Sequence, residues 1–360
     1  MNNNRLYVDF HVLQTVPPSC VNRDDMGAPK TAEYGGKKRA RVSSQSWKRA
    51  VREEFKSLFA SNQLGYRTKK MAELVAAKLQ VLDPALSPDD AMELATSELK
   101  AAKLIAGSDK KEVLFFISSG QVDALAQVIH DAHALGTVAD VQAMKAAIMD
   151  NPSIDLCLFG RMSASDPALN FDAAAQVAHS ISTHPVSSEY DYFTAVDDCS
   201  TDGGSGHLGT AEFNSSTLYR YANVNISELM EHMSAEEAVV AVRGFAEAFV
   251  KSMPTGKMNS FANRTLPDMV YVTLRTDQPI NLVGAFEKPI YAGNSGYMAH
   301  SKIAFEQYAA GMYKDWVSAP PAAWHVGDFG EEKDGFALGT KCSLNELFDA
   351  LHAEMKKRLM

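Results

Sequence analysis

Helix patterns dominate residues 68–149, and they interrupt a chain whose flanking parts show strand patterns. Before this stretch, residues 6–12 carry an apolar side chain at every second position, which is the period of a strand with one buried face. Strand patterns return at residues 154–159 and 190–196. We therefore predict an α/β (α+β) domain that carries a helical insertion.

Capping and turn residues set the expected bounds of the other elements. Ser234 and Ser343 are each followed three residues later by glutamate, the capping-box pattern that opens a helix. Residues 197–216 contain the run Gly203-Gly204-Ser205-Gly206, which predicts a protruding loop because glycine disfavours regular elements. We also expect helices from Ser43 or Ser44, Ser87 and Thr137, strands at residues 112–117, 217–226 and 269–274, and a loop at residues 17–34. The 360 residues suffice for about two structural units of roughly 100–200 residues.

Positive charge is concentrated in one early segment of an acidic chain. The formal net charge is −9, which argues against a protein that binds nucleic acid over its whole surface. Residues 30–52 reverse this sign. They contain a single acid, Glu33, beside the cations Lys30, Lys37, Lys38, Arg39, Arg41, Lys48, Arg49 and Arg52. Any nucleic-acid site is therefore expected in this segment.

The helix that begins in this segment is amphipathic. Its apolar stripe contains Trp47, Val51, Phe55, Leu58 and Phe59. Gln45, Lys48 and Arg52 project from neighbouring turns of one side, with Arg49 beside them. Such a row can bind consecutive phosphates, because lysine and arginine supply charge while Gln45 and the two serines supply hydrogen bonds without base preference. The alternative is a solvated amphipathic helix without a ligand.

Motifs for catalysis or metal binding are weak. The runs Asn22-Arg23-Asp24-Asp25 and Asp197-Asp198 offer the carboxylates that magnesium prefers, but aspartate is common in turns for its own reasons. His130-x-x-His133, His179 and His184 have no partner at a metal or triad spacing, and no GxSxG, HExxH or P-loop string occurs. We expect no catalytic residue, no metal and no cofactor.

Cysteine spacing and hydropathy indicate the cellular compartment of the chain. Cys20, Cys157, Cys199 and Cys342 form no CxxC pair, so reduced thiols are expected. No run approaches the roughly 18 consecutive apolar residues of a membrane span, and the first residues lack the apolar segment of a secretory signal. We expect a cytoplasmic protein without a membrane partner.

Five aromatic residues flank the glycine-rich loop, namely Tyr190, Tyr192, Phe193, Tyr219 and Tyr221. Some are expected on the buried face of a strand pair. Those on the other face could stack or wedge against nucleic-acid bases.

Several strings resemble a known family. They are Pro18–Asp25 (PSCVNRDD), Tyr34–Arg39 (YGGKKR), Arg41–Ala50 (RVSSQSWKRA) and Asp191–Asp198 (DYFTAVDD), followed by Phe159–Met162, His207–Thr210, Tyr219–Asn223, Pro267–Val270 and Ala285–Lys288. Together they resemble the CasC family, the Cas-seven-type backbone subunit of the type I-E CRISPR complex Cascade. The matches are ordered along most of the chain.

The resemblance implies a three-part fold. A modified ferredoxin-like (RRM-like) palm would comprise residues 1–56 and 152–360. A helical finger would occupy residues 57–151. A thumb hairpin loop would lie at about residues 190–222, within the second part of the palm.

The resemblance also implies a function. In that family, several copies polymerise along a CRISPR RNA, and target DNA is then recognised by pairing with this guide. The family's partners are the large subunit, the small subunit and the guide-end-capping subunits of Cascade. Residues implied in binding the RNA backbone are Arg23, Lys30, Ser44, Gln45, Lys48, Arg49 and Arg52. Residues implied in kinking the guide and flipping out one base are Met162, Phe193, Thr194, His207 and Leu208.

Two alternatives remain at this level. A related backbone family of type III complexes cleaves RNA with an aspartate, which would give Asp24 or Asp25 a catalytic role in a metal-dependent endoribonuclease. The type I-E-like strings argue against it, because that branch leaves cutting to a separate helicase-nuclease. The other alternative is a protein scaffold in which the basic helix binds an acidic partner.

Overall fold

The computed structural model describes residues 5–105, 114–163, 166–196, 205–329 and 338–360. The chain forms two compact units, the number that its length suggests. Unit 1 contains residues 1–54, 176–227 and 242–360, and unit 2 contains residues 55–175 and 228–241. The division into palm, finger and thumb that the resemblance implies stays a prediction.

Unit 1 is built on a mostly antiparallel sheet. Its strand order is β12-β11-β10-β1-β9-β7-β3-β2, and β6 and β8 pair with β9 off this path. The strands are β1 (Tyr7–Ser19), β2 (Thr31–Tyr34), β3 (Lys37–Val42), β6 (Ala175–Val177), β7 (Ser180–Ser182), β8 (Glu189–Val196), β9 (Ser205–Asn225), β10 (Met269–Arg275), β11 (Ala322–Val326) and β12 (Thr340–Lys341). Strand β1 lies between β9 and β10, antiparallel to both.

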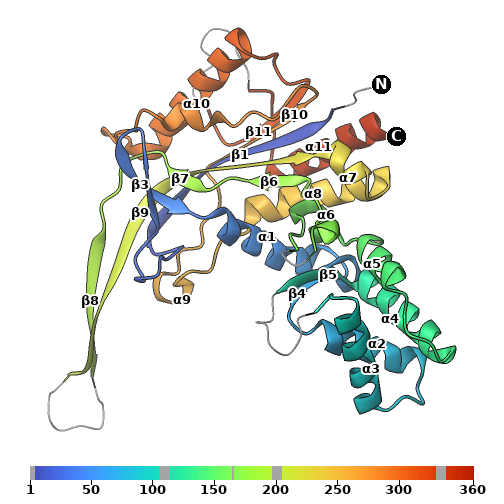
Figure 1. Cartoon of the computed structure of the whole chain (residues 1–360). Coiled ribbons are helices and arrows are strands. Elements are labelled where there is room, and N and C mark those ends of the chain that lie inside the picture. Colours follow the sequence, from blue (N-terminus) through green and yellow to red (C-terminus); the bar gives the residue numbers. More distant parts are fainter. Residues whose placement is uncertain (1–4, 106–113, 164–165, 197–204, 330–337) are drawn as a thin grey trace. The chain divides into compact units, whose positions relative to one another are not determined.

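Helices cover both faces of this sheet. They are α1 (Ser44–Leu58), α7 (Ile226–Met230), α8 (Ala235–Lys251), α9 (Met258–Phe261), η3 (Leu282–Phe286), α10 (Gly296–Asp315) and α11 (Leu344–Leu359). Successive side chains of a strand point to opposite faces. Phe10 packs against Phe245 of α8, with 5.4 Å between the ring centroids. His11 packs against Phe305 of α10 at 5.6 Å, so α8 and α10 lie on opposite faces (Figure 1).

The prediction of a single buried face on the first strand was wrong. Asp9 and His11, the polar positions of the alternating pattern, are as buried as Val8 and Phe10. The Asp9 carboxylate accepts hydrogen bonds from the Tyr221 hydroxyl at 2.9 Å and from the Ile280 amide at 2.9 Å. Burial raises the pKa of Asp9 to about 7 and lowers that of His11 to about 3. A second helical layer therefore covers a face that the sequence pattern assigns to water.

Unit 2 holds its own apolar core among short helices. Its elements include η1 (Ser61–Gln63), β4 (Gly65–Thr68), α2 (Met71–Leu82), α3 (Pro88–Ala101), β5 (Phe115–Ser118), α4 (Ser119–Ala134), α5 (Val141–Met149), α6 (Ile154–Phe159) and η2 (Pro167–Leu169). Val75, Leu99, Leu125 and Ile148 are among the fully buried residues of this core. Within the described residues, the helical stretch predicted at residues 68–149 is confirmed, with β5 as its strand.

The helix starts predicted at Ser87, Ser234 and Ser343 are confirmed, and the one predicted at Thr137 is not. The Ser87 hydroxyl accepts a hydrogen bond from the Asp90 amide at 3.2 Å. The capping boxes at Ser234 and Ser343 are confirmed by reciprocal bonds to their glutamates. The start predicted at Thr137 was wrong, because Asp140 caps α5 by accepting from the Ala143 amide at 2.9 Å.

Three other predictions differ from the structure. Residues 154–159 form helix α6, because a short apolar run fits a buried helix as well as a buried strand. The expected loop at residues 197–216 is already strand from Ser205, since β8 supplies partners to this part of β9. The loop expected at residues 17–34 begins later, because β1 continues through Ser19, and its end belongs to β2. None of the helices in the described ranges is long and apolar enough to span a bilayer.

Candidate nucleic-acid interface

Helix α1 is fixed to unit 1 by its apolar side. Trp47 and Val51 are fully buried. The Trp47 indole donates a hydrogen bond to the Ser180 hydroxyl at 2.9 Å, and the Arg220 guanidinium lies 3.8 Å from the centre of the Trp47 ring. These contacts leave the opposite side of the helix to solvent.

The start of α1 is tied to the loop that carries Arg23. The Ser43 amide donates to the Asn22 side chain at 2.9 Å, and the Ser43 hydroxyl accepts from the Ser46 amide. Of the two predicted caps, Ser43 therefore acts as the cap. Ser44 is the first helical residue.

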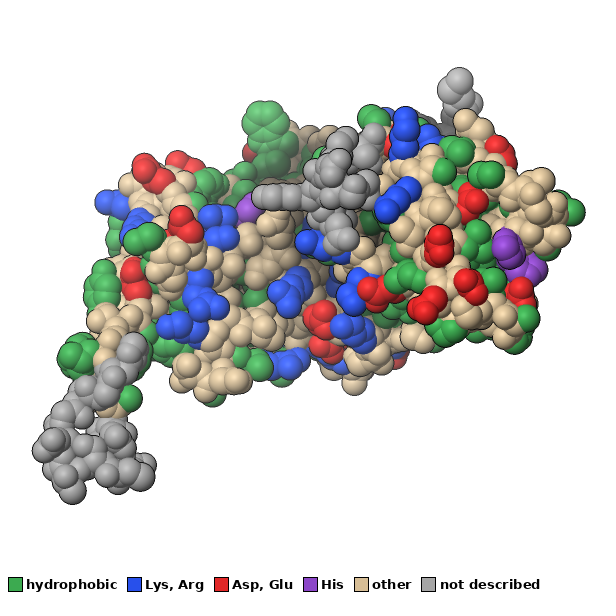
Figure 2. Space-filling model, turned by 60° about the horizontal axis from the view of Figure 1, so that its bottom comes forward, with side chains coloured by type: hydrophobic (Ala, Val, Ile, Leu, Met, Phe, Trp, Pro, Cys, Tyr) green, Lys and Arg blue, Asp and Glu red, His purple; other side chains and the backbone are tan. Residues whose placement is uncertain are grey.

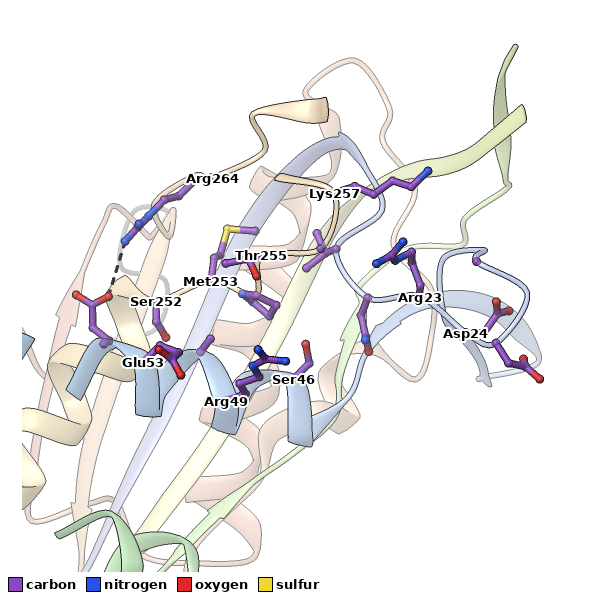
Figure 3. A pocket seen from close by; sticks show the side chains of 18 residues that line it. Arg23, Asp24, Ser46, Arg49, Glu53, Ser252, Met253, Thr255, Lys257 and Arg264 are labelled. Carbon is purple, nitrogen blue, oxygen red and sulfur yellow. Dashed lines mark ion pairs between the residues drawn. The ribbon is translucent and has the colours of Figure 1, made fainter. Parts of the chain in front are cut away.

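The predicted RNA-binding residues divide between two flanks of α1. Gln45, Lys48 and Arg52 share one flank by helical spacing, and Gln45 is exposed whereas Lys48 and Arg52 are partly buried. Arg49 lies on the other flank, beside Ser46 and facing Arg23 across a cavity (Figure 3). The structure thus brings Arg23 and Arg49 to one place and puts Lys48 and Arg52 on the neighbouring flank.

Lys30 belongs to a third group of cations. Arg41 lies with one guanidinium nitrogen 3.1 Å from Nδ1 of His179. The pKa of His179 is lowered first by burial and then by the charges of Arg41 and Lys30. Lys30 and Arg41 therefore supply the positive charge around His179.

The basic run at residues 37–41 contributes less surface charge than its sequence indicates. Arg39 is fully buried. Its guanidinium donates to the carbonyl oxygens of Ser182 at 2.9 Å and Phe286 at 3.0 Å, so it holds β3 to its neighbours. Figure 2 shows that the Lys and Arg side chains visible in this view are mixed with Asp and Glu side chains.

The cavity beside α1 has a volume of about 940 Å³. Its cations come from the loop after β1, from α1, and from residues 252–264, and they are Arg23, Arg49, Lys257 and Arg264. Its acids are Asp24, Asp25, Glu53 and Glu54. The sequence pattern missed Lys257 and Arg264, because they lie some 200 residues from the basic segment and carry no motif.

Asp24 shapes the turn that presents Arg23. One oxygen of its carboxylate accepts hydrogen bonds from the amides of Met26 and Ala28, each at 2.9 Å. This is the turn chemistry expected of aspartate. The other predicted carboxylate pair, Asp197-Asp198, lies outside the described residues.

The structure shows the surroundings of one of these histidines and of three cysteines. His184 accepts from the Thr217 amide at 3.0 Å through Nε2 and is 2.8 Å from the Pro185 carbonyl through Nδ1. It is a hydrogen-bonded neutral side chain, and burial lowers its pKa. Cys20, Cys157 and Cys342 are free thiols, and Cys199 lies outside the described residues.

Strands β8 and the first part of β9 form an antiparallel ribbon that extends from the sheet of unit 1 (Figure 1). Tyr190, Tyr192, Phe193 and Leu208 are exposed on it, between 44% and 67%. Tyr219 and Tyr221, further along β9, are buried in the core. The five aromatic residues therefore separate into exposed and buried groups, as the sequence allowed. An exposed apolar ribbon of two strands is marginal in water and indicates a surface for a partner.

Residues implied in kinking the guide lie in both units. Thr194 pairs with Leu208, and Phe193 lies opposite Gly209, where a Cβ atom would come within 2.4 Å of its ring. Glycine therefore leaves room for the Phe193 ring. His207 pairs with Ala195 through the backbone. Met162 belongs to unit 2 and is 88% exposed between the buried residues Arg161 and Ser163.

Comparison with known proteins places this geometry in a family. The Cas family described as CT1975-like protein matches residues 8–350. The chain belongs to this family. No curated protein matches it.

Two solved structures similar to the chain agree with this assignment. A chain of a structure described as "CRISPR RNA-guided surveillance complex, pre-nicking" is 34% identical, with a TM-score of 0.81, and the match covers 97% of this chain and 100% of that chain. A chain of a "CRISPR RNA-guided surveillance complex" is 32% identical, with a TM-score of 0.64, over 97% of this chain and 99% of that chain. The predicted fold class, a mixed α/β fold with a ferredoxin-like palm, is confirmed. Neither description names a subtype.

Proposed function

We propose that this CT1975-like chain is the CRISPR RNA-binding backbone subunit of a type I-E Cascade complex, of the CasC type. The observation that carries the proposal is α1, whose apolar side is locked to the sheet by Trp47 while Lys48, Arg49 and Arg52 remain on its outer flanks. A rigid row of cations binds sugar-phosphate without base preference. The similarity to chains of RNA-guided surveillance complexes supports the same function.

In this proposal, copies of the chain assemble side by side on the guide. The ribbon of β8 and β9 reaches a neighbouring copy, and its exposed Phe193 and Leu208 provide apolar surface for that contact. Met162, Phe193, Thr194, His207 and Leu208 kink the guide, which then pairs with target DNA. The large, small and guide-end-capping subunits complete the complex.

We propose a binding role without catalysis. Asp24 is engaged by two backbone amides of its own turn, which supports a structural role over that of a metal ligand in an endoribonuclease. Incubation of the protein and guide with complementary RNA and magnesium should leave the RNA intact. Cleavage that Asp24→Ala or Asp25→Ala abolishes would favour the endoribonuclease instead.

The test of RNA binding is the double variant Lys48→Ala/Arg52→Ala, measured by fluorescence anisotropy on two unrelated single-stranded RNAs. Affinity should fall by a similar factor on both, and the slope of log K against log salt should decrease by about 1.4, at roughly 0.7 per phosphate contact. The control is Lys356→Ala/Lys357→Ala, which removes two exposed cations from α11. Wild-type affinity of the Lys48/Arg52 variant at low and high salt would refute the role of α1.

The assembly proposal has its own test. Phe193→Ser/Leu208→Ser should keep the fold and the binding of short RNA but lose the ordered particles that wild-type protein forms on longer guides. Electron microscopy of both proteins on one guide makes the comparison. Regular assemblies from the variant would contradict the role of the ribbon. Purification of the complex from the host and identification of its subunits decides the subtype.

A further inference from the structure

Met162 is an exposed apolar side chain of unit 2 with buried neighbours. It is 88% exposed, whereas Arg161 and Ser163 are 5% and 7% exposed. A methionine side chain has three rotatable bonds and adapts readily to its surroundings. It can act at one defined place on a ligand only if the backbone that carries it is held. The contacts of the residues on each side therefore decide what Met162 can do.

The backbone before Met162 is fixed against Phe171. Arg161 and Phe171 exchange two backbone hydrogen bonds, one from the Arg161 amide at 2.9 Å and one from the Phe171 amide at 2.8 Å. Gly160 has a φ of +70°, and a Cβ atom there would lie 2.7 Å from the Phe171 carbonyl oxygen. Glycine is therefore needed where α6 ends, since a side chain would push this pairing apart. The Phe171 ring packs in turn on the His232 ring, with 4.3 Å between the ring centres.

The Arg161 side chain joins four segments of unit 2, namely β5, α4, α5 and η2. Its guanidinium donates hydrogen bonds to four oxygen acceptors, which are the carbonyls of Leu169 (2.9 Å), Phe116 (3.1 Å) and Ile148 (3.2 Å) and the side chain of Gln121 (3.3 Å). Burial lowers the pKa of Arg161 to about 10, so the group stays charged at neutral pH. A buried charge is costly unless hydrogen bonds satisfy it. Here those bonds fix the residue directly before Met162.

The backbone after Met162 is held by Asn170. The side-chain oxygen of Asn170 accepts a hydrogen bond from the Ser163 amide at 2.7 Å. Asn170 is itself exposed, so its side chain fixes the position of Ser163 without filling the core of unit 2. Both neighbours of the exposed Met162 are therefore bonded to the body of unit 2.

We propose that Arg161 and Asn170 are positioning residues, which hold Met162 in one place so that it can insert between two bases of the guide. The inference rests on the proposed function, in which Met162 takes part in kinking the guide, and it deepens that function. Separating stacked bases costs free energy. A wedge whose backbone is already ordered loses none of its contact energy to ordering. A loosened wedge should leave more of the bases stacked.

The test follows base flipping with 2-aminopurine, whose fluorescence increases when the base is unstacked. Single substitutions along the RNA locate the bright positions on wild-type protein at saturating concentration, and Met162→Ala should lose this brightness. Asn170→Ala should shift the equilibrium between flipped and stacked base by about threefold, the equivalent of one hydrogen bond. RNA affinity should stay as in the wild type, because the cations of α1 are unchanged.

Two further variants control for chemistry and for fold. Asn170→Asp keeps an oxygen acceptor for the Ser163 amide and should restore the brightness. Asn62→Ala removes another exposed asparagine of unit 2 and should match the wild type. If Asn170→Asp behaves as Asn170→Ala does, the hydrogen bond to Ser163 is not what positions Met162.

Arg161→Lys tests the other side of Met162. Lysine keeps the charge but presents one nitrogen in place of a planar fork, so it cannot serve all four acceptors. The brightness should fall by more than in Asn170→Ala. Thermal unfolding reports whether unit 2 is folded at the assay temperature, and if it is not, the Asn170 variants decide.

A double-variant cycle separates positioning from a general structural role. In the Met162→Ala background, Asn170→Ala should cause no further change in brightness, because the side chain that it positions is absent. An equal additional loss in that background would overturn the inference.

The outcomes also distinguish this inference from the proposed function. If no position is bright on wild-type protein, or if Met162→Ala keeps the brightness, the wedge role in the proposed function fails and this inference fails with it. If Met162→Ala loses the brightness while Asn170→Ala and Arg161→Lys match the wild type, the positioning role is wrong and the wedge role stands.

Discussion

The charged residues of this protein occupy two contrasting environments. Four arginine side chains are buried and donate hydrogen bonds to protein oxygen atoms. They are Arg39, Arg161, Arg220 and Arg275. Arg49 of α1 is exposed, and Arg264 has 60% of its side chain accessible. The same residue type therefore organises the fold in one place and remains accessible to a ligand in the other. A count of cations in the sequence overstates the surface for nucleic acid.

The largest expected effect is on a buried arginine. Arg220 donates to the Gln14 side chain at 2.6 Å and to the Phe249 carbonyl, and it lies over Trp47. Arg220→Ala leaves both acceptors unsatisfied and opens a cavity, so unfolding free energy should fall by about 3 kcal/mol. Urea denaturation measures it, with Arg264→Ala as the exposed control. A loss of unfolding free energy below about 1 kcal/mol would contradict the distinction between buried and exposed arginines.

The most direct comparison is between the buried Arg39 and its exposed neighbour Lys38. Arg39→Ala removes donors from three carbonyl oxygens, those of Ser182, Phe286 and Glu287, and should cost about 2 kcal/mol of stability. Lys38→Ala, one residue away and exposed, should stay within about 0.5 kcal/mol. Equal effects in thermal denaturation would show that burial does not decide the role of a cation here.

Two buried titratable residues, Asp9 and His11, should make stability respond to pH in opposite ways. The pKa of Asp9 is raised to about 7, mainly by burial, so its contribution to stability is present below about pH 4 and is lost as pH rises through 7. The pKa of His11 is lowered to about 3, mainly by burial, so its contribution is present above about pH 6.5 and is lost as pH falls. Between pH 4 and 6.5 the two effects oppose each other.

Single variants separate these two effects. In urea denaturation between pH 4 and 6.5, His11→Phe should become more stable relative to wild type as pH falls, and Asp9→Asn should become less stable. Each difference should approach about 1.4 kcal/mol per pH unit, the value for one proton. Parallel pH curves for the wild type and both variants would contradict the assigned pKa shifts.

The smallest expected effect belongs to an exposed ion pair. Lys70 and Glu73 on unit 2 are 3.0 Å apart, with 71% and 50% of their side chains accessible. Water and salt screen such a pair, so Lys70→Ala should change stability by less than about 0.5 kcal/mol. Thermal denaturation of the variant beside Arg220→Ala gives both ends of the comparison in one assay.

The contrast explains which predictions from sequence succeeded. Local signals were sufficient where one residue sets a structure, as at the Ser87, Ser234 and Ser343 caps and on the apolar side of α1. They failed at residues 154–159, where every side chain of α6 is buried and no polar position marks the period. The sequence placed Arg49 and Arg23 in the candidate site but missed Lys257 and Arg264, which only chain folding brings to the cavity beside α1.

By itself, the sequence determined the fold class, the basic helix and the family resemblance, because these depend on periodicity and on motifs that neighbouring residues form. Only the tertiary structure decided that Asp9 and His11 are buried, that Arg39 serves the core, and that Lys257 lines the same cavity as Arg49. Burial and proximity between distant segments depend on how the sheet and its helices pack, and no local pattern encodes them.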